Sequence, residues 1–585
     1  MEGIFSMIKT LLRSVREYKR SSILTPILVS CEVVVECIIP FVTAKLVSEI
    51  ERGCGLDVIL RYGLLLAGMA ILSLTFGALA GHFCAVAACG FAKNLRHDLY
   101  ASVQKYSFAN IDKFSTSSLV TRLTTDVSNV QMAYMMLIRT AVRCPFMLIF
   151  ALVMAVIISP TMSLAFAVIV PFLGIGLFLI MRSAHPIFRA VFKKYDRLNE
   201  SIQENVHGMR VVKAYVREDY EKEKFGAASL DVAKDFTKAE KLLALNSPLM
   251  QICFNALMIA ICLFGSRLVV TSNQTALQIG EMSALLTYGA QILMSLMFLS
   301  MIVVMVVMSA ASAGRIAEVL SEESAIVNPE NPVMEVADGS IMFRNVRFRY
   351  SEKAEKDALS DINLFIGSGE TVGIIGGTGV GKTSLVQLIS RLYDVSDGSV
   401  TVGGVDVREY DLDVLRNEVA VVLQKNVLFS GTIKENLRWG DPDASDEEIE
   451  RICRLAQADD FVKSFPDGYD TYIEQGGTNV SGGQKQRLCI ARALLRKPKI
   501  LILDDSTSAV DTKTDALIRK AFAEEIPDTT KIIIAQRVSS VEHADKILVM
   551  EDGRIVDMGT HEELLVSSSI YREVYESQTR GGEEA

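Results

Sequence analysis

The residues best suited to bind phosphate form one glycine-rich run in the second half of the chain. The run consists of Gly376, Gly377, Thr378, Gly379, Val380, Gly381, Lys382, Thr383 and Ser384. It follows an apolar segment, residues 371–375, that is typical of a buried strand, and it opens a segment with a helical pattern. Glycines let successive N–H groups turn inward around a phosphate, and a helix N-terminus adds partial positive charge. Lys382 can reach the β- and γ-phosphates, and the Thr383 hydroxyl can ligate Mg²⁺.

This order of strand, glycine loop and helix predicts a site for a nucleoside triphosphate with Mg²⁺. The alternative is a glycine-rich turn without a ligand, and the spacing and context favour the nucleotide site. Asp504 fits the same site, because it ends the apolar strand 500–503 and a carboxylate there can hold Mg²⁺ through water. Tyr350 ends an alternating strand, and it could stack on adenine or be an edge tyrosine without a ligand.

A second candidate anion site lies at the start of another predicted helix. The residues Ser481, Gly482, Gly483 and Gln484 precede a helical run at 488–495. Backbone N–H groups at a helix N-terminus bind anions, so this segment is also predicted to contact phosphate.

The first half of the chain is too apolar for an ordinary soluble protein. Half of the 585 residues are hydrophobic, and the mean hydropathy is +0.30. A helix needs about 20 apolar residues to cross a bilayer. Suitable segments are residues 22–46, 58–92, 133–158, 161–181, 248–270 and 282–308. The predicted fold is therefore an α-helical polytopic membrane domain of six transmembrane helices, followed by an α/β P-loop nucleotide-binding domain.

The charges between these segments predict their orientation. The short connections 47–57, 159–160 and 271–281 contain one arginine and no lysine, whereas the leader and the two long connections are rich in both. By the positive-inside rule both termini lie in the cytoplasm. The leader, residues 1–20, is apolar at helical spacing with basic residues between, which predicts an amphipathic elbow helix on the membrane surface.

Composition excludes several other classes of protein. The net charge is −9, and the sequence carries no footprint of a nucleic-acid partner. The ten cysteines lie singly in apolar or helical stretches, without a disulfide or metal-binding pattern. The N-terminus lacks the pattern of a cleavable signal peptide.

The two long cytoplasmic connections have helical patterns with short breaks. The breaks at 108–115 and 214–220 could be transverse helices that touch the nucleotide-binding domain; the alternative is a plain helical hairpin without a partner. The chain is thus expected to divide into an elbow (1–20), a membrane domain (21–318), a linker (319–338), a nucleotide-binding domain (339–578) and a polar tail (579–585).

Glu32 and Glu36 share one face of the first predicted span. A charge at the bilayer centre costs about 2.5–3.5 kcal/mol, so such residues usually face a cavity. The pair could form the wall of a substrate cavity that recognises a cation or responds to protons. Helix–helix hydrogen bonds or the lipid headgroups could equally satisfy it. Methionines at helical spacing in the sixth span favour packing at a helix seam over an adaptable binding surface: Met294, Met297, Met301, Met305 and Met308.

These motifs resemble, over essentially the full length, an ABC exporter half-transporter of the multidrug type. The phosphate loop resembles Walker A, Asp504 ends a Walker B strand, and Val480 to Gln484 resembles the LSGGQ signature. Gln424 matches the Q-loop glutamine that contacts Mg²⁺, and Tyr350 matches the aromatic residue that stacks on adenine. The remaining matches are a D-loop at Ser508, Ala509, Val510 and Asp511, and the loop 474–477 that meets the transverse helices.

The resemblance implies a dimer in which each ATP lies between the Walker A loop of one chain and the signature of the other. The family's catalytic base is a Glu after the Walker B Asp, but here it is Asp505, whose shorter side chain should fall short of the attacking water. The family's switch residue is a His that touches the γ-phosphate, but here Gln536 occupies that place, and a glutamine can donate a hydrogen bond but cannot carry charge. Both departures concern the ATP held by Lys382, so the sequence predicts a degenerate site that binds MgATP and hydrolyses it poorly.

The predicted function is ATP-driven export of amphipathic small molecules, drug-like or lipid-like, across a bacterial cytoplasmic membrane. A different half-transporter with an intact Glu and His would form the heterodimer, and this chain would contribute Ser481, Gly482 and Gly483 to the hydrolysing site. Two alternatives stay open: a homodimeric exporter of lipid or peptide in which Asp505 is the base, and a non-pumping regulator gated by ATP. An importer is disfavoured because the membrane domain is fused ahead of the nucleotide domain.

Overall fold

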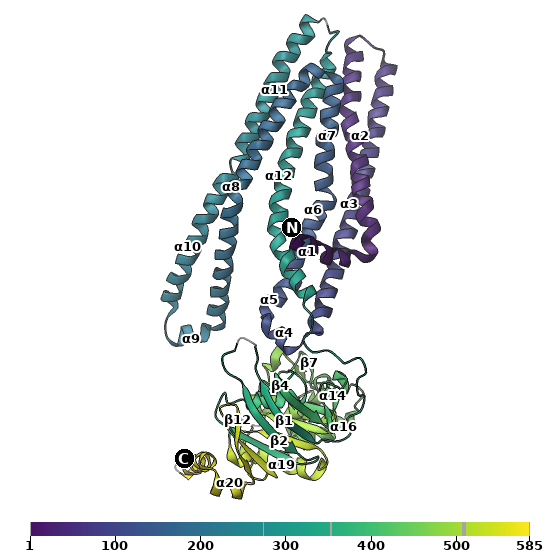
Figure 1. The fold of residues 1–585 in the computed structure, drawn as a ribbon. Helices are drawn as coiled ribbons and strands as arrows, with labels where there is room; N and C mark the ends of the chain where they lie inside the picture. The colour runs from purple at the N-terminus through teal and green to yellow at the C-terminus, as the bar shows by residue number, and fades with distance from the viewer. Residues whose placement is uncertain (1, 273, 352–353, 506–509, 584–585) are drawn as a thin grey trace. The chain divides into compact units, whose positions relative to one another are not determined.

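The chain forms two compact units (Figure 1). The computed structural model describes residues 2–272, 274–351, 354–505 and 510–583. The helical unit comprises Met1–Gln104 and Ser115–Glu322, and the α/β unit comprises Lys105–Phe114 and Glu323–Ala585.

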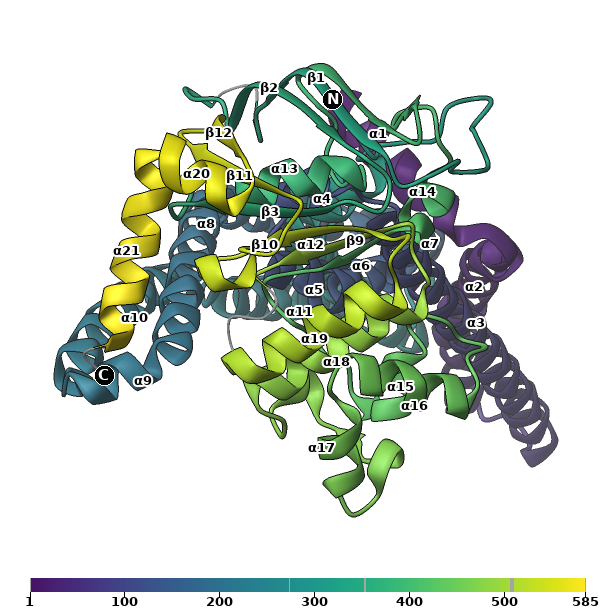
Figure 2. The same ribbon diagram turned by 90° about the horizontal axis from the view of Figure 1, so that it is seen from below.

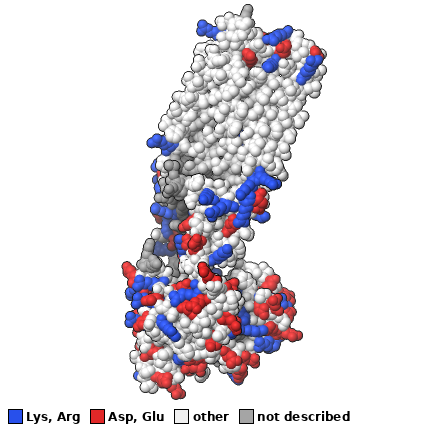
Figure 3. Space-filling view, turned by 45° about the vertical axis from the view of Figure 1, so that its right-hand side comes forward, with Lys and Arg blue, Asp and Glu red and all other residues white. Residues whose placement is uncertain are grey.

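The helical unit has the spans that the sequence predicts. Within the described residues, six helices or runs of helices are long and apolar enough to cross a membrane. Figure 3 shows the corresponding band of surface, on which Lys, Arg, Asp and Glu are nearly absent. The elements of this unit are α1 (Glu2–Leu12), the 3₁₀ turn η1 (Arg13–Tyr18), α2 (Lys19–Glu51), α3 (Leu56–Gln104), α5 (Thr116–Thr121), the π-helical turn η2 (Arg122–Asp126), α6 (Val127–Ile138), α7 (Thr140–Ile158), α8 (Pro160–His207), α9 (Met209–Ala214), α10 (Glu218–Leu243), α11 (Asn246–Thr271) and α12 (Ile279–Ser321).

The ends of these helices follow from local sequence signals. Ser159 caps α8 by accepting a hydrogen bond from the Met162 N–H, and Pro160 occupies the first helical position, where its missing N–H costs nothing. The prediction of a transverse helix at 214–220 is wrong in position. Gly208 ends α8, α9 follows at once, and the turn before α10 contains Val216 with a positive φ of 53°.

The α/β unit is built on two sheets. Its elements are α4 (Phe108–Lys113), β1 (Ile341–Phe348), β2 (Leu359–Ile366), β3 (Thr371–Gly376), α13 (Lys382–Ile389), β4 (Asp397–Val402), β5 (Val405–Asp406), α14 (Leu412–Glu418), β6 (Val419–Val422), β7 (Gly431–Thr432), α15 (Ile433–Leu437), α16 (Asp446–Leu455), α17 (Asp459–Ser464), η3 (Gly468–Asp470), β8 (Tyr472–Ile473), η4 (Gln475–Gly477), α18 (Gly482–Leu495), β9 (Ile500–Asp504), α19 (Thr512–Glu525), β10 (Thr530–Ile534), η5 (Val538–Ser540), β11 (Lys546–Glu551), β12 (Arg554–Gly559), α20 (His561–Ser567) and α21 (Ser569–Glu583).

The larger sheet positions the candidate site. Its order is β12-β11-β3-β10-β9-β6, and all neighbours are parallel except β12. Figure 2 shows α13 on one side of this sheet and α18 and α19 on the other, which explains why β9 and β10 are buried along their whole length. The carboxyl ends of β3, β10 and β9 therefore meet at one edge, where ligands of such sheets bind.

The short helix α4 interrupts the first long connection between the predicted spans and packs within the α/β unit. Ser107 and Asn110 form a capping box at its start. The Tyr393 hydroxyl donates to Asp112 Oδ2 at 2.7 Å, and the Phe108 and Tyr393 ring centroids are 6.1 Å apart. These contacts confirm the prediction of a short helix at 108–115 that touches the nucleotide-binding domain.

Two expected boundaries differ from the helices and strands observed. Most of the segment expected as a linker, 319–338, packs on the α/β unit, because its apolar residues Ile326 and Val336 are buried and Val333 pairs with Tyr410. At the other end, α21 continues to Glu583, past residue 578 where the polar tail was expected.

Candidate nucleotide-binding site

The glycine-rich run forms a closed loop between β3 and α13. Gly381 has φ +96°, and a Cβ atom there would lie 2.7 Å from the Ala358 carbonyl oxygen, so only glycine fits. The Lys382 ammonium donates to the carbonyl oxygens of Gly376 and Gly377, at 2.7 Å each. Burial lowers the pKa of Lys382, and the nearby carboxylates of Asp504 and Asp505 oppose that shift. The loop is therefore a preformed cradle with a half-buried cation, which suits a phosphate chain.

A hydroxyl and a carboxylate meet beside this cradle. Thr383 Oγ1 donates to the Asp504 carboxylate, at 2.9 Å to Oδ2 and 3.1 Å to Oδ1. Asp504 is buried at the end of β9, and this burial raises the pKa of its carboxyl. Hard oxygen donors of this kind are the ligands that Mg²⁺ prefers. The residues present thus fit MgATP, with Thr383 and Asp504 on the metal side and Lys382 on the phosphate side.

Asp505, Gln424 and Gln536 come together at the edge of the sheet. Gln536 Nε2 donates to Asp505 Oδ2 at 2.8 Å, and the Gln424 side chain also hydrogen-bonds to the Asp505 carboxyl. Burial raises the pKa of Asp505, while these two hydrogen bonds oppose the rise. A carboxylate whose lone pairs accept from two amides has less capacity to take a proton from water.

Tyr350 follows β1 by two residues in the sequence, and in space its side chain reaches the first turn of α13. Its hydroxyl is 2.8 Å from Ser384 Oγ, and its ring meets the Tyr393 ring edge-on at a centroid distance of 5.2 Å. Half of its surface is exposed (49%), so a face of the ring is available to a base.

In the signature segment, residues 480–484, the side chains of Ser481 and Gln484 bond to each other's backbone N–H groups. Ser481 caps α18: its hydroxyl accepts from the Gln484 N–H at 3.3 Å, and Gln484 Oε1 accepts from the Ser481 N–H at 2.9 Å. Ser481 and Gly482 are exposed at the first turn. In the predicted D-loop, Ser508 and Ala509 lie outside the described residues, Val510 is buried, and Asp511 caps α19 by accepting from the Thr514 N–H.

Comparison with known proteins decides the family. A family model for the ABC transporter transmembrane region matches residues 23–297, and the ABC transporter model matches residues 359–508. The uncharacterized ABC transporter ATP-binding protein YfiB of Bacillus subtilis is 35% identical over 552 residues, which cover 94% of this chain and 95% of YfiB. The chain belongs to the ABC transporter family.

Two further comparisons extend this result. The transporter is 35% identical over 487 residues to a Bacillus subtilis protein named probable multidrug resistance ABC transporter ATP-binding/permease protein YheI, covering 83% of each chain. A bacterial Atm1-family ABC exporter with ATP bound matches its fold with a TM-score of 0.83 at 24% identity, covering 96% of this chain and 98% of that chain. The transporter therefore has the exporter fold, with a six-helix membrane domain fused to an ABC nucleotide-binding domain.

The membrane carboxylates of the transporter have a partner that the sequence interpretation missed. Arg143 Nη1 lies 2.5 Å from Glu32 Oε1, and Arg143 Nη2 lies 2.6 Å from Glu36 Oε2. This ion-paired triad links α2 to α7 (Arg143 triad). An arginine inside the apolar segment 133–158 was the available signal, because a charge there needs a partner or water.

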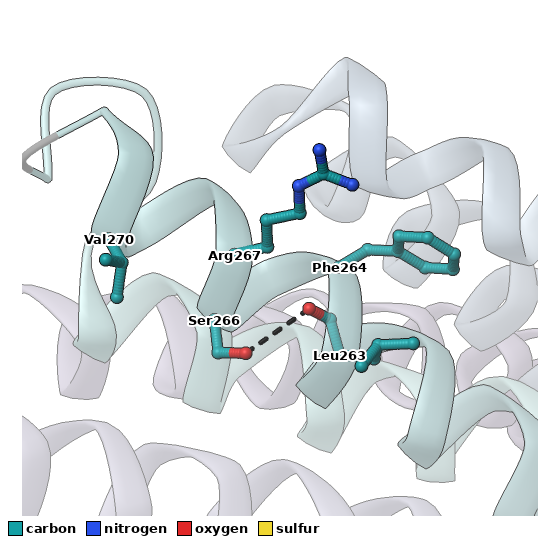
Figure 4. A pocket seen from close by; sticks show the side chains of 5 residues that line it. All are labelled: Leu263, Phe264, Ser266, Arg267 and Val270. Atoms are coloured by element: carbon teal, nitrogen blue, oxygen red, sulfur yellow. Dashed lines mark hydrogen bonds between the residues drawn. The ribbon is translucent and has the colours of Figure 1, made fainter.

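The methionines of α12 do not form a packed seam within this chain. Met294, Met297, Met301 and Met308 are exposed, so packing as the sequence predicts would require a second chain. A separate hollow along α11 has a volume of about 460 Å³. Figure 4 shows the residues that line it: Leu263, Phe264, Ser266, Arg267 and Val270. Ser266 donates there to the Leu263 carbonyl of its own helix, and the hollow lacks the convergent polar groups of a ligand site.

Proposed function

We propose that this transporter exports amphipathic small molecules, drug-like or lipid-like, from a bacterial cytoplasm as one half of a heterodimer. In this proposal its own ATP site binds MgATP and hydrolyses it slowly. The exporter fold and the likeness to YheI support the transport of such molecules. Both termini would lie in the cytoplasm, since the basic residues gather in the long connections and the leader.

The observation that carries the proposal is the environment of Asp505. The residue in the position of the general base has a short side chain, and the Gln424 and Gln536 amides hydrogen-bond to it. A general base must lie within hydrogen-bond reach of the water that it activates. A carboxylate that is both shorter and already hydrogen-bonded is poorly suited to that role.

The rest of the site supports tight nucleotide binding. Lys382 would donate to the terminal phosphates, Thr383 and Asp504 would hold Mg²⁺, and Tyr350 would stack on the adenine. Bound Mg²⁺ would neutralise charge on the phosphates. The protein side chains thus bind and orient ATP, while the base that should remove a proton from water is impaired.

The signature of this chain supports a partner with an intact site. Ser481 and Gly482 are exposed at the N-terminus of α18, so their hydroxyl and N–H groups are accessible to an ATP held by another chain. We expect the partner half-transporter to supply a Glu and a His in the positions of Asp505 and Gln536. Hydrolysis would then occur mainly at the site that contains the Ser481, Gly482 and Gly483 of this chain.

The test is ATP turnover by the full-length chain purified alone in lipid nanodiscs. We expect turnover close to background, and no change on Asp505→Asn. The combined change Asp505→Glu and Gln536→His should raise turnover about 10- to 100-fold, because a positioned base contributes about 10²–10⁴.

The control for this gain is Lys382→Ala in the repaired chain, which should abolish the added turnover and so assign it to this site. Robust turnover by the unaltered chain that Asp505→Asn removes would contradict the degenerate site and support a homodimer. Nucleotide binding without uphill transport in vesicles, even with a partner half-transporter present, would support a regulator gated by ATP.

A further inference from the structure

The C-terminal helix α21 presents one face to the core of the α/β unit. Tyr571 is fully buried, and its hydroxyl lies 2.7 Å from His561 Nδ1. Val574 and Tyr575 pack against the same core cluster. Gln578 follows at the same helical spacing, so it lies on the face that the apolar residues anchor.

Gln578 makes two hydrogen bonds to one short stretch of backbone. Its Oε1 accepts from the Val538 N–H at 2.9 Å, and its Nε2 donates to the Gln536 carbonyl oxygen at 2.8 Å. The side-chain amide thereby spans Arg537 and fixes the backbone on both sides of it. Two well-formed hydrogen bonds from one planar group restrict position and orientation together.

The fixed stretch is the one that carries the switch residue. The Gln536 side chain donates to Asp505 Oδ2 at 2.8 Å, so its backbone is held by α21 while its side chain lies at the base position. The far end of the stretch is held separately: Arg519 Nη1 donates to the Ser539 carbonyl oxygen at 2.8 Å, and Ser540 Oγ donates to Asp515 Oδ2 at 3.1 Å. While α19 holds the far end, Gln578 holds the backbone at the end nearest the nucleotide, next to Ala535, whose N–H donates to the Ile374 carbonyl oxygen at 3.2 Å.

We propose that Gln578 is a positioning residue of the ATP site and that α21 controls the switch segment through it. The inference rests on the proposed role of Gln536 beside the γ-phosphate. When Gln578 holds the backbone, the Gln536 amide is kept at the phosphate end of the site and retains bound nucleotide. When α21 moves or Gln578 is lost, the segment is free to swing away, and ATP leaves sooner.

The experiment measures the release rate of labelled ATP from the full-length transporter in nanodiscs. Gln578→Met keeps the length of the side chain and removes both hydrogen bonds. We expect release to become about 2- to 10-fold faster, the factor that corresponds to one or two neutral hydrogen bonds, with an unchanged association rate. Ser577→Ala, at the neighbouring exposed position of α21, is the matched control and should release ATP at the original rate.

A double-mutant cycle separates positioning from general stability. If Gln578 acts through the switch residue, Gln578→Met should have no further effect in a chain that already carries Gln536→Ala. Gln578→Glu is the second variant: it keeps the acceptor for Val538 and loses the donor to Gln536, so it should speed release as Gln578→Met does.

The inference would be overturned if Gln578→Met changed the ATP release rate by the same factor in the original chain and in the Gln536→Ala chain. It would also be overturned if Gln578→Met changed the rate in neither chain. The cycle reads ATP release, whereas the degenerate site is tested by turnover and Asp505→Asn. A chain that hydrolyses robustly but still shows the coupling between Gln578 and Gln536 would therefore refute the proposed function alone.

Discussion

Two pairs of carboxylates in this transporter have different kinds of partner. Asp504 and Asp505 accept hydrogen bonds from a hydroxyl and from side-chain amides, while the Lys382 ammonium donates to backbone carbonyls. Glu32 and Glu36 instead share the guanidinium of Arg143 directly. In the proposed function Asp504 would bind the incoming Mg²⁺, whereas Glu32 and Glu36 are already paired with a cation inside the chain. The same functional group, a carboxylate, thus belongs to the candidate nucleotide site in one unit and to a helix–helix link in the other.

Removing the cation of the Arg143 triad should have the largest effect. Arg143→Ala leaves two carboxylates unpaired between membrane helices. Losing one partner of a buried pair typically costs about 3–5 kcal/mol, and because Arg143 and Glu36 are partly exposed, we expect the lower end of that range. The change should lower the unfolding temperature in detergent and the yield of monodisperse protein. The combined neutral replacement Glu32→Gln, Glu36→Gln and Arg143→Met should stay close to the original, because it leaves no charge unpaired.

Arg267→Met, which replaces an exposed side chain of α11, is the matched control for that experiment and should leave stability unchanged. If Arg143→Ala proves as stable as Arg267→Met, the triad does not hold α2 and α7 together.

Loss of the cation in the phosphate cradle comes next in size. Lys382→Ala should weaken ATP binding about 10- to 100-fold, since each hydrogen bond to a charged group contributes about 1.5–3 kcal/mol. Equilibrium binding of a fluorescent ATP analogue measures the change. Lys513→Ala, an exposed lysine of α19, is the control. Equal affinities for the two variants would remove Lys382 from the site.

Replacing the buried carboxylate of Asp504 should have opposite effects on the stability of the free protein and on its stabilisation by MgATP. Without nucleotide, Asp504→Asn should raise the unfolding free energy by about 0.5–2 kcal/mol, the range of single stabilising changes at such sites, because a buried charge is removed. The same variant should lose the extra stability that MgATP gives the original protein. Thermal unfolding with and without MgATP tests both statements. Retained stabilisation by MgATP would show that Asp504 does not help hold the metal.

The smallest expected effect concerns the substrate. We propose that Glu36 contributes to recognition of cationic substrates, because two carboxylates share the single positive charge of Arg143 and the Glu36 side chain is 33% exposed, against 12% for Glu32. Glu36→Gln should reduce transport of a cationic substrate relative to a neutral one about 2- to 5-fold, as expected for a partly solvated charge pair. Glu32→Gln should change the ratio less. Transport in inverted vesicles, with the partner half-transporter present, measures the ratio, and an identical ratio in all three chains would contradict the role of Glu36.

Sequence patterns predicted most of the fold because its signals are local. The spans follow from length and hydropathy, and the Walker A loop follows from glycines, lysine and threonine in a fixed order. The short helix at 108–115 was also predicted, whereas α9 was misplaced because the helical pattern continues through 209–220 and gives no clear sign of where Gly208 ends α8.

Contacts between distant segments were not predictable in the same way. Arg143 meets Glu32 and Glu36 across more than a hundred residues, and only their shared depth in the membrane links them. Gln424, Asp505 and Gln536 were each assigned from their motifs, but their mutual hydrogen bonds depend on the order of β6, β9 and β10 in the sheet. Gln578 lies outside every motif, and only the packing of α21 reveals its contact with the switch segment.

The helix α4 connects two parts of the chain that are about two hundred residues apart in sequence. The chain passes between the two units three times, at residues 104–105, 114–115 and 322–323. Inside the α/β unit, α4 is bonded to the segment that follows α12: Asn110 Nδ2 donates to the Glu323 carbonyl oxygen at 3.0 Å, and Asn110 Oδ1 accepts from the Ala325 N–H at 3.1 Å. The segments that follow α3 and α12 are thus held together, where they enter the α/β unit, by the side chain of one asparagine.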